Sequence, residues 1–379
     1  MAKKATKTKE NKIIDMSIFC SAKQALEREK TKTVLPVSPS VDLRLGGGII
    51  EGSLVLIRGM AKCGKSLTCM EIAVNALKQG RKVLYFDTEC RLTASKYLVV
   101  GDFDLQEHPN FFLFNSESGQ IENGVMKFIG GEKMYSQIIA MMKMSKYKGA
   151  VYIIDSISCV LTQDVLDDPE VRADRRDPSG KLNADFCKKV GPYIRMSNSI
   201  VVGIQHLAVD MSPMGHGALK PIGGDRLNYS CDIVLDSRHS PMDLDGSTVA
   251  GGFEKGKDAI SGILIRYNLP VNKLLGPYVA KEKEEKIQNY YIFGHGCWKG
   301  KELLTVLDEL GLINKSGSWI SFITEKITDR VQGSDKAAKI VEDNLEYFEQ
   351  IVKDYYMETY GINYNFVSSQ EESDEDSDD

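Results

Sequence analysis

Short apolar runs alternate with helical patterns along the central part of this chain. Helices are predicted where apolar residues recur at helical spacing, over 65–78, 132–147 and 182–196. Strands are predicted from the apolar runs at 54–57, 82–87, 150–155, 199–205, 231–238, 262–268 and 290–294. Because buried strands separated by helices are typical of parallel sheets, the pattern predicts an α/β fold whose mainly parallel central sheet is covered on both faces.

The N-terminal part differs from this core. Residues 1–12 are rich in lysine and are predicted to be a basic disordered arm. The apolar positions of 13–30 predict a short helix, so residues 1–35 are expected to form an N-terminal helical arm. Such a helix either docks on a neighbouring subunit or packs on its own domain, and the residues alone favour neither. Residues 31–50 hold two prolines and a run of three glycines, which predicts a linker into the core.

The C-terminal part also differs from the core in its pattern of residues. The core is expected to span 36–296, after which a helix, a tight turn and charged helical stretches predict a small α/β domain over 297–365. The last residues, 366–379, are rich in serine and acidic groups and are predicted to be disordered. Seven acidic groups lie in 371–379, and without them the net charge of −5 would be +2. The acidic balance therefore does not argue against a nucleic-acid partner.

Composition narrows the class of protein. With 379 residues, 42% of them hydrophobic and 27% charged, the chain is an ordinary globular protein long enough for one large core. No apolar run approaches about 18 residues and no secretory signal is visible, so we expect a cytoplasmic protein without a membrane partner. The eight cysteines are scattered without a C-x-x-C pair, which favours reduced core thiols and argues against a zinc site.

A phosphate-binding loop follows the first strand of the core. Residues 59–66 read GMAKCGKS, the full GxxxxGK[ST] pattern between a predicted strand and a predicted helix. Glycines let successive backbone N–H groups face phosphate oxygens, and the helix adds the positive end of its dipole. Lys65 can reach the β and γ phosphates and Ser66 can ligate Mg²⁺, which predicts a nucleoside triphosphate site. The residues expected to contact the nucleotide are Gly59, Met60, Ala61, Lys62, Cys63, Gly64, Lys65, Ser66 and Leu67.

Polar side chains close three of the predicted strands, at the edge where parallel sheets bind their ligands. Asp155 ends an apolar strand as a Walker B carboxylate does and can hold Mg²⁺ beside Ser66, although strand-end carboxylates also cap helices. Glu89 follows another strand and can orient and deprotonate an attacking water; a salt-bridged surface glutamate is the alternative. Gln205 and His206 end a third strand and can sense a γ-phosphate, unless His206 is simply a half-buried histidine.

Two long segments interrupt the core, at 162–181 and 207–222. Long irregular segments in a compact domain are usually functional or mobile. Basic groups beside apolar ones suit a nucleic-acid backbone, and the candidate contacts are Arg172, Arg175, Arg176, Lys181, Met211, Met214, Lys220, Gly223 and Gly224. Five aspartates in the first segment weaken its positive charge, so charge alone leaves DNA binding open.

The order of these motifs resembles that of the RecA/UvsX family of DNA strand-exchange recombinases, bacterial or bacteriophage proteins, over most of residues 40–360. After GMAKCGKS come YFDTE at 85–89, YIIDS at 152–156, GIQH at 203–206 and IGGDRLNYSCDIVLDSR at 222–238. The segment GLINKSGSWISFITEKI at 311–327 is similar to the C-terminal domain of bacterial RecA, and an acidic tail follows in both.

The resemblance implies a RecA-like P-loop ATPase core whose cofactors are ATP and Mg²⁺. It makes Glu89 and Lys65 the catalytic residues and the two long segments the first and second DNA-binding loops. His206, with Gln205 beside it, becomes the γ-phosphate sensor.

The resemblance also bears on subunit contacts. It implies that Tyr97 lies near the adenine and that Lys273 reaches the ATP of the adjacent subunit. Val271 stands where the family has a second lysine, so half of that pair is absent or moved.

The implied assembly is a helical filament of this chain on single-stranded DNA, with ATP at each subunit interface. The filament would pair with double-stranded DNA in recombination and repair, in the cytoplasm, at the nucleoid or in a phage-infected host. Its acidic tail would compete with DNA, so deletion of 368–379 is expected to tighten DNA binding. Two rivals share the core: a ring-shaped helicase-like motor, and a non-catalytic filament paralogue that binds ATP without turnover.

Overall fold

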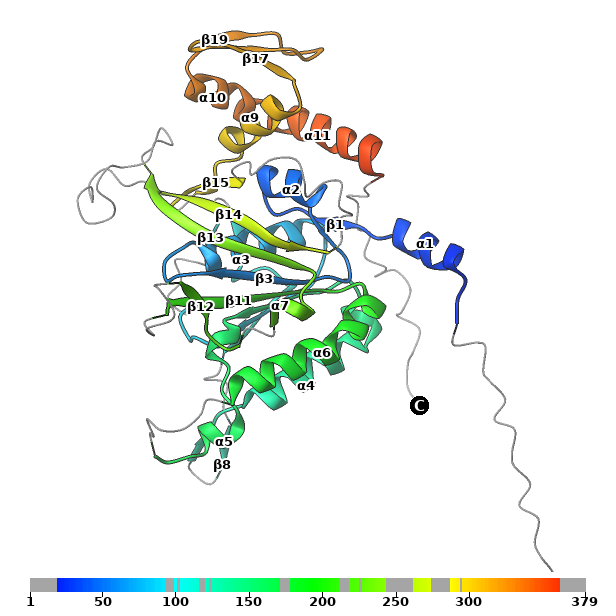
Figure 1. The fold of residues 1–379 in the computed structure, drawn as a ribbon, viewed down its shortest axis with the longest axis vertical. Coiled ribbons are helices and arrows are strands. Elements are labelled where there is room, and N and C mark those ends of the chain that lie inside the picture. Colours follow the sequence, from blue (N-terminus) through cyan, green and yellow to red (C-terminus); the bar gives the residue numbers. More distant parts are fainter. Residues whose placement is uncertain are drawn as a thin grey trace, which may run out of the picture.

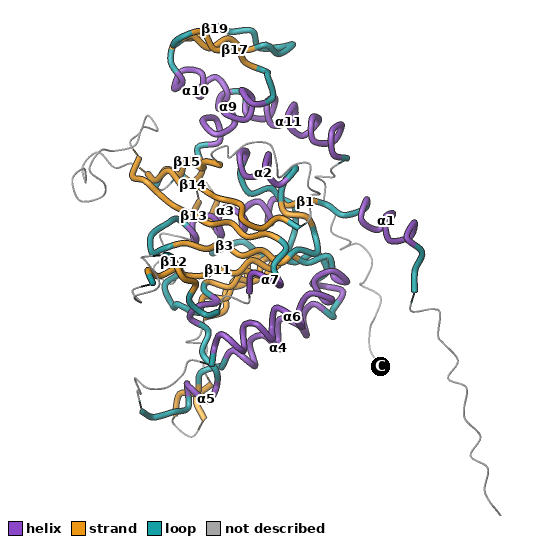
Figure 2. Tube along the Cα trace, in the orientation of Figure 1, coloured by secondary structure: helices purple, strands orange, loops and turns teal. Residues whose placement is uncertain are grey.

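The computed structural model describes the chain from residue 19 to residue 361 (Figures 1 and 2). The gaps in this description are residues 93–98, 101–102, 116–119, 123–124, 171–177, 211–217, 225–226, 243–261, 274–286 and 294.

The centre of the molecule is a ten-stranded sheet in the order β16-β15-β14-β13-β3-β11-β10-β4-β7, with β12 paired to β11 (Figure 1). Each neighbouring pair from β13 to β7 is parallel, which confirms the predicted mainly parallel sheet. The parallel strands are β3 (Leu54–Gly59), β4 (Val83–Asp87), β7 (Phe111–Asn115), β10 (Val151–Asp155), β11 (Ile200–Val209) and β13 (Ile233–Met242). The antiparallel strands are β12 (Leu219–Pro221), β14 (Gly262–Asn272), β15 (Ile287–Ile292) and β16 (Gly296–Cys297).

Two apolar layers cover this sheet because side chains alternate along each strand. In β3, Val55 and Ile57 face the cluster that contains α3 (Lys65–Lys78), whereas Leu54 and Leu56 face α4 and α6 on the other side. Helix α4 spans Gly131–Met142 and α6 spans Ser179–Ser197. The predicted helix at 132–147 is too long, because the chain leaves α4 at Lys143 and forms a separate 3-10 turn, η2, at Ser145–Tyr147.

Residues 31–50 are not a linker. Strand β1 (Val34–Leu35) pairs with β2 (Ile49–Ile50), and α2 (Pro39–Leu45) lies between them. Leu35, Val41 and Ile49 are fully buried in the main core. The proline and glycines that suggested a flexible segment instead start and end α2, since proline suits the first helical turn and Gly46 takes a left-handed conformation at its end.

The predicted N-terminal helix is present in the described chain only as α1 (Ala22–Lys30), because residues 13–18 lie outside the description. Ser21 and Gln24 form a capping box at its start. No residue of α1 is buried, so the helix makes no core contact with its own subunit. No helix in the described ranges is long and apolar enough to cross a membrane.

The C-terminal elements share a hydrophobic cluster of their own, at the top of Figure 1. Leu307, Ile320, Val341 and Phe348 are at its centre, and Leu43 of α2 joins it from the core. The elements are α9 (Lys299–Glu309), β17 (Ile313–Ser316), β18 (Trp319–Phe322), β19 (Arg330–Gln332), α10 (Ser334–Asp343) and α11 (Leu345–Tyr360). Short elements elsewhere are β5 (Val99–Val100), β6 (Phe103–Asp104), β8 (Gln120–Glu122), β9 (Val125–Lys127), η3 (Ile157–Cys159), α5 (Gln163–Leu166) and α7 (Leu227–Ser230).

Candidate nucleotide site

Residues 59–66, the predicted phosphate loop, join the end of β3 to the start of α3. Its two glycines stand where no side chain fits. A Cβ at Gly59 would lie 2.5 Å from the Ser237 hydroxyl oxygen, and one at Gly64 would lie 2.4 Å from Ile265 Cδ1. Gly64 also has a φ of 81°, which glycine adopts without strain. The loop can therefore curl only with glycine at these positions.

Lys65 and Ser66 make defined contacts at the start of α3. The Lys65 ammonium donates to the Met60 carbonyl at 2.7 Å, and burial lowers its pKa. Ser66 Oγ donates to Asp155 Oδ2 at 2.7 Å, and the Tyr85 hydroxyl donates to the same oxygen at 2.7 Å. Burial raises the pKa of Asp155, against the effect of both donors. A hydroxyl beside a carboxylate is an all-oxygen ligand pair, which fits Mg²⁺.

Tyr85 is a member of this site that the motifs do not indicate. We expect Tyr85→Phe to lower the free energy of unfolding by about 1–3 kcal/mol, because the buried Asp155 carboxylate loses a donor. Urea unfolding at neutral pH measures the change. The control is Tyr152→Phe in the adjacent strand, since the Tyr152 hydroxyl is buried without a hydrogen-bond partner among the described residues. Equal losses in the two variants would contradict the assigned contact.

The rest of the phosphate loop divides into exposed and packed residues. Met60, Ala61 and Lys62 are exposed, and Lys62 has a φ of 63°. Cys63 is buried, with its thiol 3.4 Å from His239 Nδ1. Leu67 packs against the main core cluster, so core packing by itself explains why an apolar residue stands at this position.

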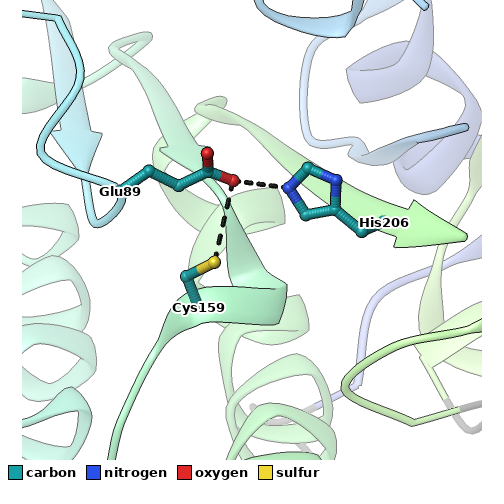
Figure 3. Close-up of side chains that lie close together, drawn as sticks. All are labelled: Glu89, Cys159 and His206. Atoms are coloured by element: carbon teal, nitrogen blue, oxygen red, sulfur yellow. Dashed lines mark hydrogen bonds and ion pairs between the residues drawn. The ribbon is translucent and has the colours of Figure 1, made fainter. Parts of the chain in front are cut away.

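Glu89 lies just past β4, and its Oε1 accepts hydrogen bonds from His206, Ser156 and Cys159, of which Figure 3 draws the first and the last. Its Oε1 is 2.5 Å from His206 Nε2 and 2.9 Å from Ser156 Oγ, and Arg91 approaches Oε2 at 3.4 Å. The His206 hydrogen bond is the main cause that lowers the pKa of Glu89 to about 2, opposed by burial and assisted by Ser156. The side chain is 11% exposed, so it is more enclosed than a surface glutamate paired only with Arg91.

Cys159 also approaches this carboxylate, which the sequence motifs do not predict. Its thiol is 3.7 Å from Glu89 Oε1, at the end of η3 (Figure 3). Burial of the sulfur raises the pKa of the thiol, although part of the residue is exposed. The only signal in the sequence is its position, four residues after the Walker B-like Asp155.

Gln205 and His206 lie inside β11, which runs on to Val209, beyond the predicted strand end at 205; they point to opposite sides and make different connections. His206 faces Glu89, whereas the fully buried Gln205 donates to the carbonyls of Ile222 and Gly224 at 3.1 and 3.0 Å. Ser158 connects His206 to the same segment: its hydroxyl accepts from the His206 backbone N–H at 2.9 Å and donates to the Ile222 carbonyl at 3.1 Å. This part of β11 is therefore hydrogen-bonded to the segment that closes the second predicted loop.

The ends of the two predicted DNA-binding loops meet. A Cβ at Gly180 in α6 would lie 3.4 Å from the Gly223 carbonyl oxygen, and one at Gly224 would lie 3.5 Å from Gly180 Cα. Lys181 and Lys220, beside these glycines, are exposed. Six other predicted contact residues lie outside the described chain: Tyr97, Arg172, Arg175, Arg176, Met211 and Met214.

Lys273 lies away from the phosphate loop of its own subunit. Its ammonium donates to the Tyr229 carbonyl at 2.8 Å, and its backbone N–H donates to the Asp232 carbonyl at 2.9 Å. The Asp232 backbone N–H in turn donates to the Leu54 carbonyl at the start of β3, whereas the phosphate loop begins at Gly59, at the other end of the strand. The length of β3 separates these ends by about 17 Å.

Comparison with known proteins gives a consistent result. No family model matches the chain. The RecA proteins of Streptococcus mutans and Streptococcus uberis are 25% and 24% identical to it over 324 residues, 85% of this chain and 76% of each relative. The RecA protein of Mannheimia haemolytica is 25% identical over 339 residues, 87% of this chain and 79% of the relative. The mainly parallel sheet, the phosphate loop and this similarity over most of the chain relate the protein to the RecA family of recombinases.

Proposed function

We propose that this protein is an ATP-dependent recombinase that forms a helical filament on single-stranded DNA and exchanges strands with homologous double-stranded DNA. The observation that carries the proposal is the contact chain from Glu89 through His206 and Gln205 to Gly224. It joins the nucleotide site to the end of the second loop. A protein whose DNA binding depends on ATP needs such a connection.

ATP is proposed to bind along residues 59–66, with its phosphates facing the backbone N–H groups. Lys65, which donates to the Met60 carbonyl, can transfer this hydrogen bond to a β or γ phosphate oxygen. Ser66 and Asp155 are the proposed ligands of Mg²⁺, which would neutralise charge on the phosphates.

Glu89 is proposed to position the attacking water. A carboxylate with a pKa of about 2 is fully ionised at neutral pH but is a weak base. It is therefore better suited to accept a hydrogen bond and orient the water than to remove its proton outright. His206 is the main cause of the low pKa, so a shift of its Nε2–H from Glu89 to the γ-phosphate would make the carboxylate more basic. His206 can thus link phosphate contact to water activation.

Gln205 is proposed to carry this signal to the DNA. We expect Gln205→Ala to reduce the stimulation of ATP hydrolysis by single-stranded DNA by about 5–150-fold, because both bonds to Ile222 and Gly224 are lost. Hydrolysis without DNA should change much less. Rates with and without DNA measure the ratio, and Gln332→Ala in the C-terminal sheet is the control. An unchanged ratio would remove Gln205 from the coupling.

The proposal extends to contacts between subunits. Lys273 is exposed and lies near the Leu54 end of β3, whereas its own phosphate loop begins at the Gly59 end, so it is proposed to serve the nucleotide of another subunit. Helix α1 presents no buried residue and is free to dock on a neighbour. Both features support a filament with ATP between subunits.

The direct test is ATP hydrolysis with and without single-stranded DNA, followed by strand exchange between homologous substrates. We expect DNA to stimulate hydrolysis and both activities to weaken as salt rises, because phosphate contacts release counterions. Hydrolysis indifferent to DNA, with duplex unwinding in place of exchange, would indicate a helicase-like motor. ATP binding without any turnover would indicate a non-catalytic paralogue.

A further inference from the structure

Three different metal-binding atoms converge beside the nucleotide site (Figure 3). They are Glu89 Oε1, Cys159 Sγ and His206 Nε2, and all lie within 4.8 Å of one another. They come from three separate elements: the segment after β4, the turn η3 and strand β11. A glutamate oxygen, a cysteine sulfur and an imidazole nitrogen form a mixed ligand set that suits zinc.

The oxygen–sulfur distance already matches that of a tetrahedral site, whereas the oxygen–nitrogen distance is shorter. With zinc bonds of about 2.0–2.3 Å, tetrahedral angles require about 3.6 Å between oxygen and sulfur and about 3.4 Å between oxygen and nitrogen. The Glu89 oxygen is 3.7 Å from Cys159 Sγ, which already fits. It is 2.5 Å from His206 Nε2, so these two groups must separate by about 0.9 Å as an ion replaces their hydrogen bond.

Neighbouring groups hold the three side chains in place. Ser156 donates to Glu89 Oε1, and the Ser158 hydroxyl accepts from the His206 backbone. Ile157, between these serines, is buried against Gly203 of β11, where a Cβ would lie 2.2 Å from its Cδ1. The turn that carries Cys159 is therefore packed on the strand that carries His206. Cys159 is exposed, which leaves a route of entry for an ion.

We propose that Glu89, Cys159 and His206 form a binding site for Zn²⁺ or a similar thiophilic divalent cation. Sulfur and imidazole ligands favour such ions over Mg²⁺, which prefers oxygen ligands in octahedral geometry. On binding, the Cys159 thiol loses one proton to solvent, and the proton of His206 moves from Nε2 to Nδ1 through solvent. The fourth coordination position is left to water.

Binding has a consequence for activity that rests on the proposed function. An ion at this site would hold both the water-positioning Glu89 and His206, so it should inhibit ATP hydrolysis. This inhibitor site is separate from Ser66 and Asp155, the proposed Mg²⁺ ligands.

The test of the site uses metal alone, without nucleotide. We expect the full-length protein to bind Co²⁺ with a sulfur-to-cobalt charge-transfer absorption, displaced by Zn²⁺. Cys159→Ser should abolish this band and weaken Zn²⁺ binding by at least about 100-fold, since even outer-shell changes weaken zinc sites by 10–100-fold. Ser156→Ala, an outer-shell change, should weaken binding by about tenfold.

Two cysteine variants control for other thiols. Cys20→Ser changes an exposed thiol far from the site in the chain, and Cys63→Ser changes the thiol next to His239. Both should keep the cobalt band. No band in the parent, or a band lost in Cys63→Ser but kept in Cys159→Ser, would overturn the proposal.

Hydrolysis measured with and without Zn²⁺ separates the site from the proposed function. We expect Zn²⁺ to inhibit the parent and Cys20→Ser, and to leave Cys159→Ser close to its own zinc-free rate. If the cobalt results hold but zinc does not slow the parent, the metal site stands and the role of Glu89 in hydrolysis fails.

Discussion

Glu89→Gln is expected to lower kcat for ATP hydrolysis by about 10²–10⁴-fold while ATP binding is kept. Glutamine has nearly the shape of glutamate and can still accept from His206 and Ser156, so the site should remain assembled. It carries no negative charge, and its amide oxygen is a much weaker acceptor for the attacking water. Steady-state hydrolysis gives kcat, and a fluorescent ATP analogue gives the binding constant.

The matched control for this variant is Glu107→Gln, which changes an exposed glutamate in the turn before β7. It should hydrolyse ATP at the parent rate. Full activity in Glu89→Gln would assign this glutamate to structure only.

A stability measurement then separates folding from chemistry. The lowered pKa of Glu89 means that its hydrogen bonds stabilise the ionised form in the folded state. Their contribution is present above the ordinary value of 4.5 and is lost as pH falls through about 2. Glu89→Gln should therefore be somewhat less stable than the parent at neutral pH, and this difference should shrink in acid.

Lys65→Ala is expected to lower kcat/KM for ATP by about 10²–10³-fold, the cost of removing one preorganised donor to developing charge. The buried ammonium is held 2.7 Å from the Met60 carbonyl, already at the phosphate loop. Hydrolysis and binding of the same fluorescent analogue measure the effect, and both should weaken.

Lys336→Ala is the matched control, because Lys336 is an exposed lysine of α10, outside the phosphate loop. An exposed charge contributes little, so kcat/KM should stay within about twofold of the parent.

Loss of activity in Lys65→Ala cannot come from unfolding if its stability is unchanged. Burial lowers the pKa of Lys65 and so disfavours its charged form in the folded state, which means that removing the charge should not destabilise the protein. Equal effects of the two variants would contradict the assigned role of Lys65.

Local sequence patterns predict an element correctly where the residues of that element alone determine its conformation. The phosphate loop, the helix at 65–78 and the central strands appear close to their predicted positions. Local patterns fail at 31–50, where proline and glycine predict a linker but form the ends of α2. The difference is burial: Leu35 and Ile49 belong to the core, and a short segment does not reveal which surface it will pack on.

The sequence by itself determined the fold class, the phosphate loop and the strand-end side chains, because periodicity and local backbone chemistry are written in consecutive residues. Only the tertiary structure decided which of those side chains meet. The register of β4 against β10 pairs Asp87 with Asp155 and so brings Glu89 to Ser156. Glu89 and His206 are 117 positions apart in the sequence, and nothing in that separation predicts their contact, which depends on strand order and register in the finished sheet. The same packing places Cys159 beside Glu89 and joins Gln205 to Gly224.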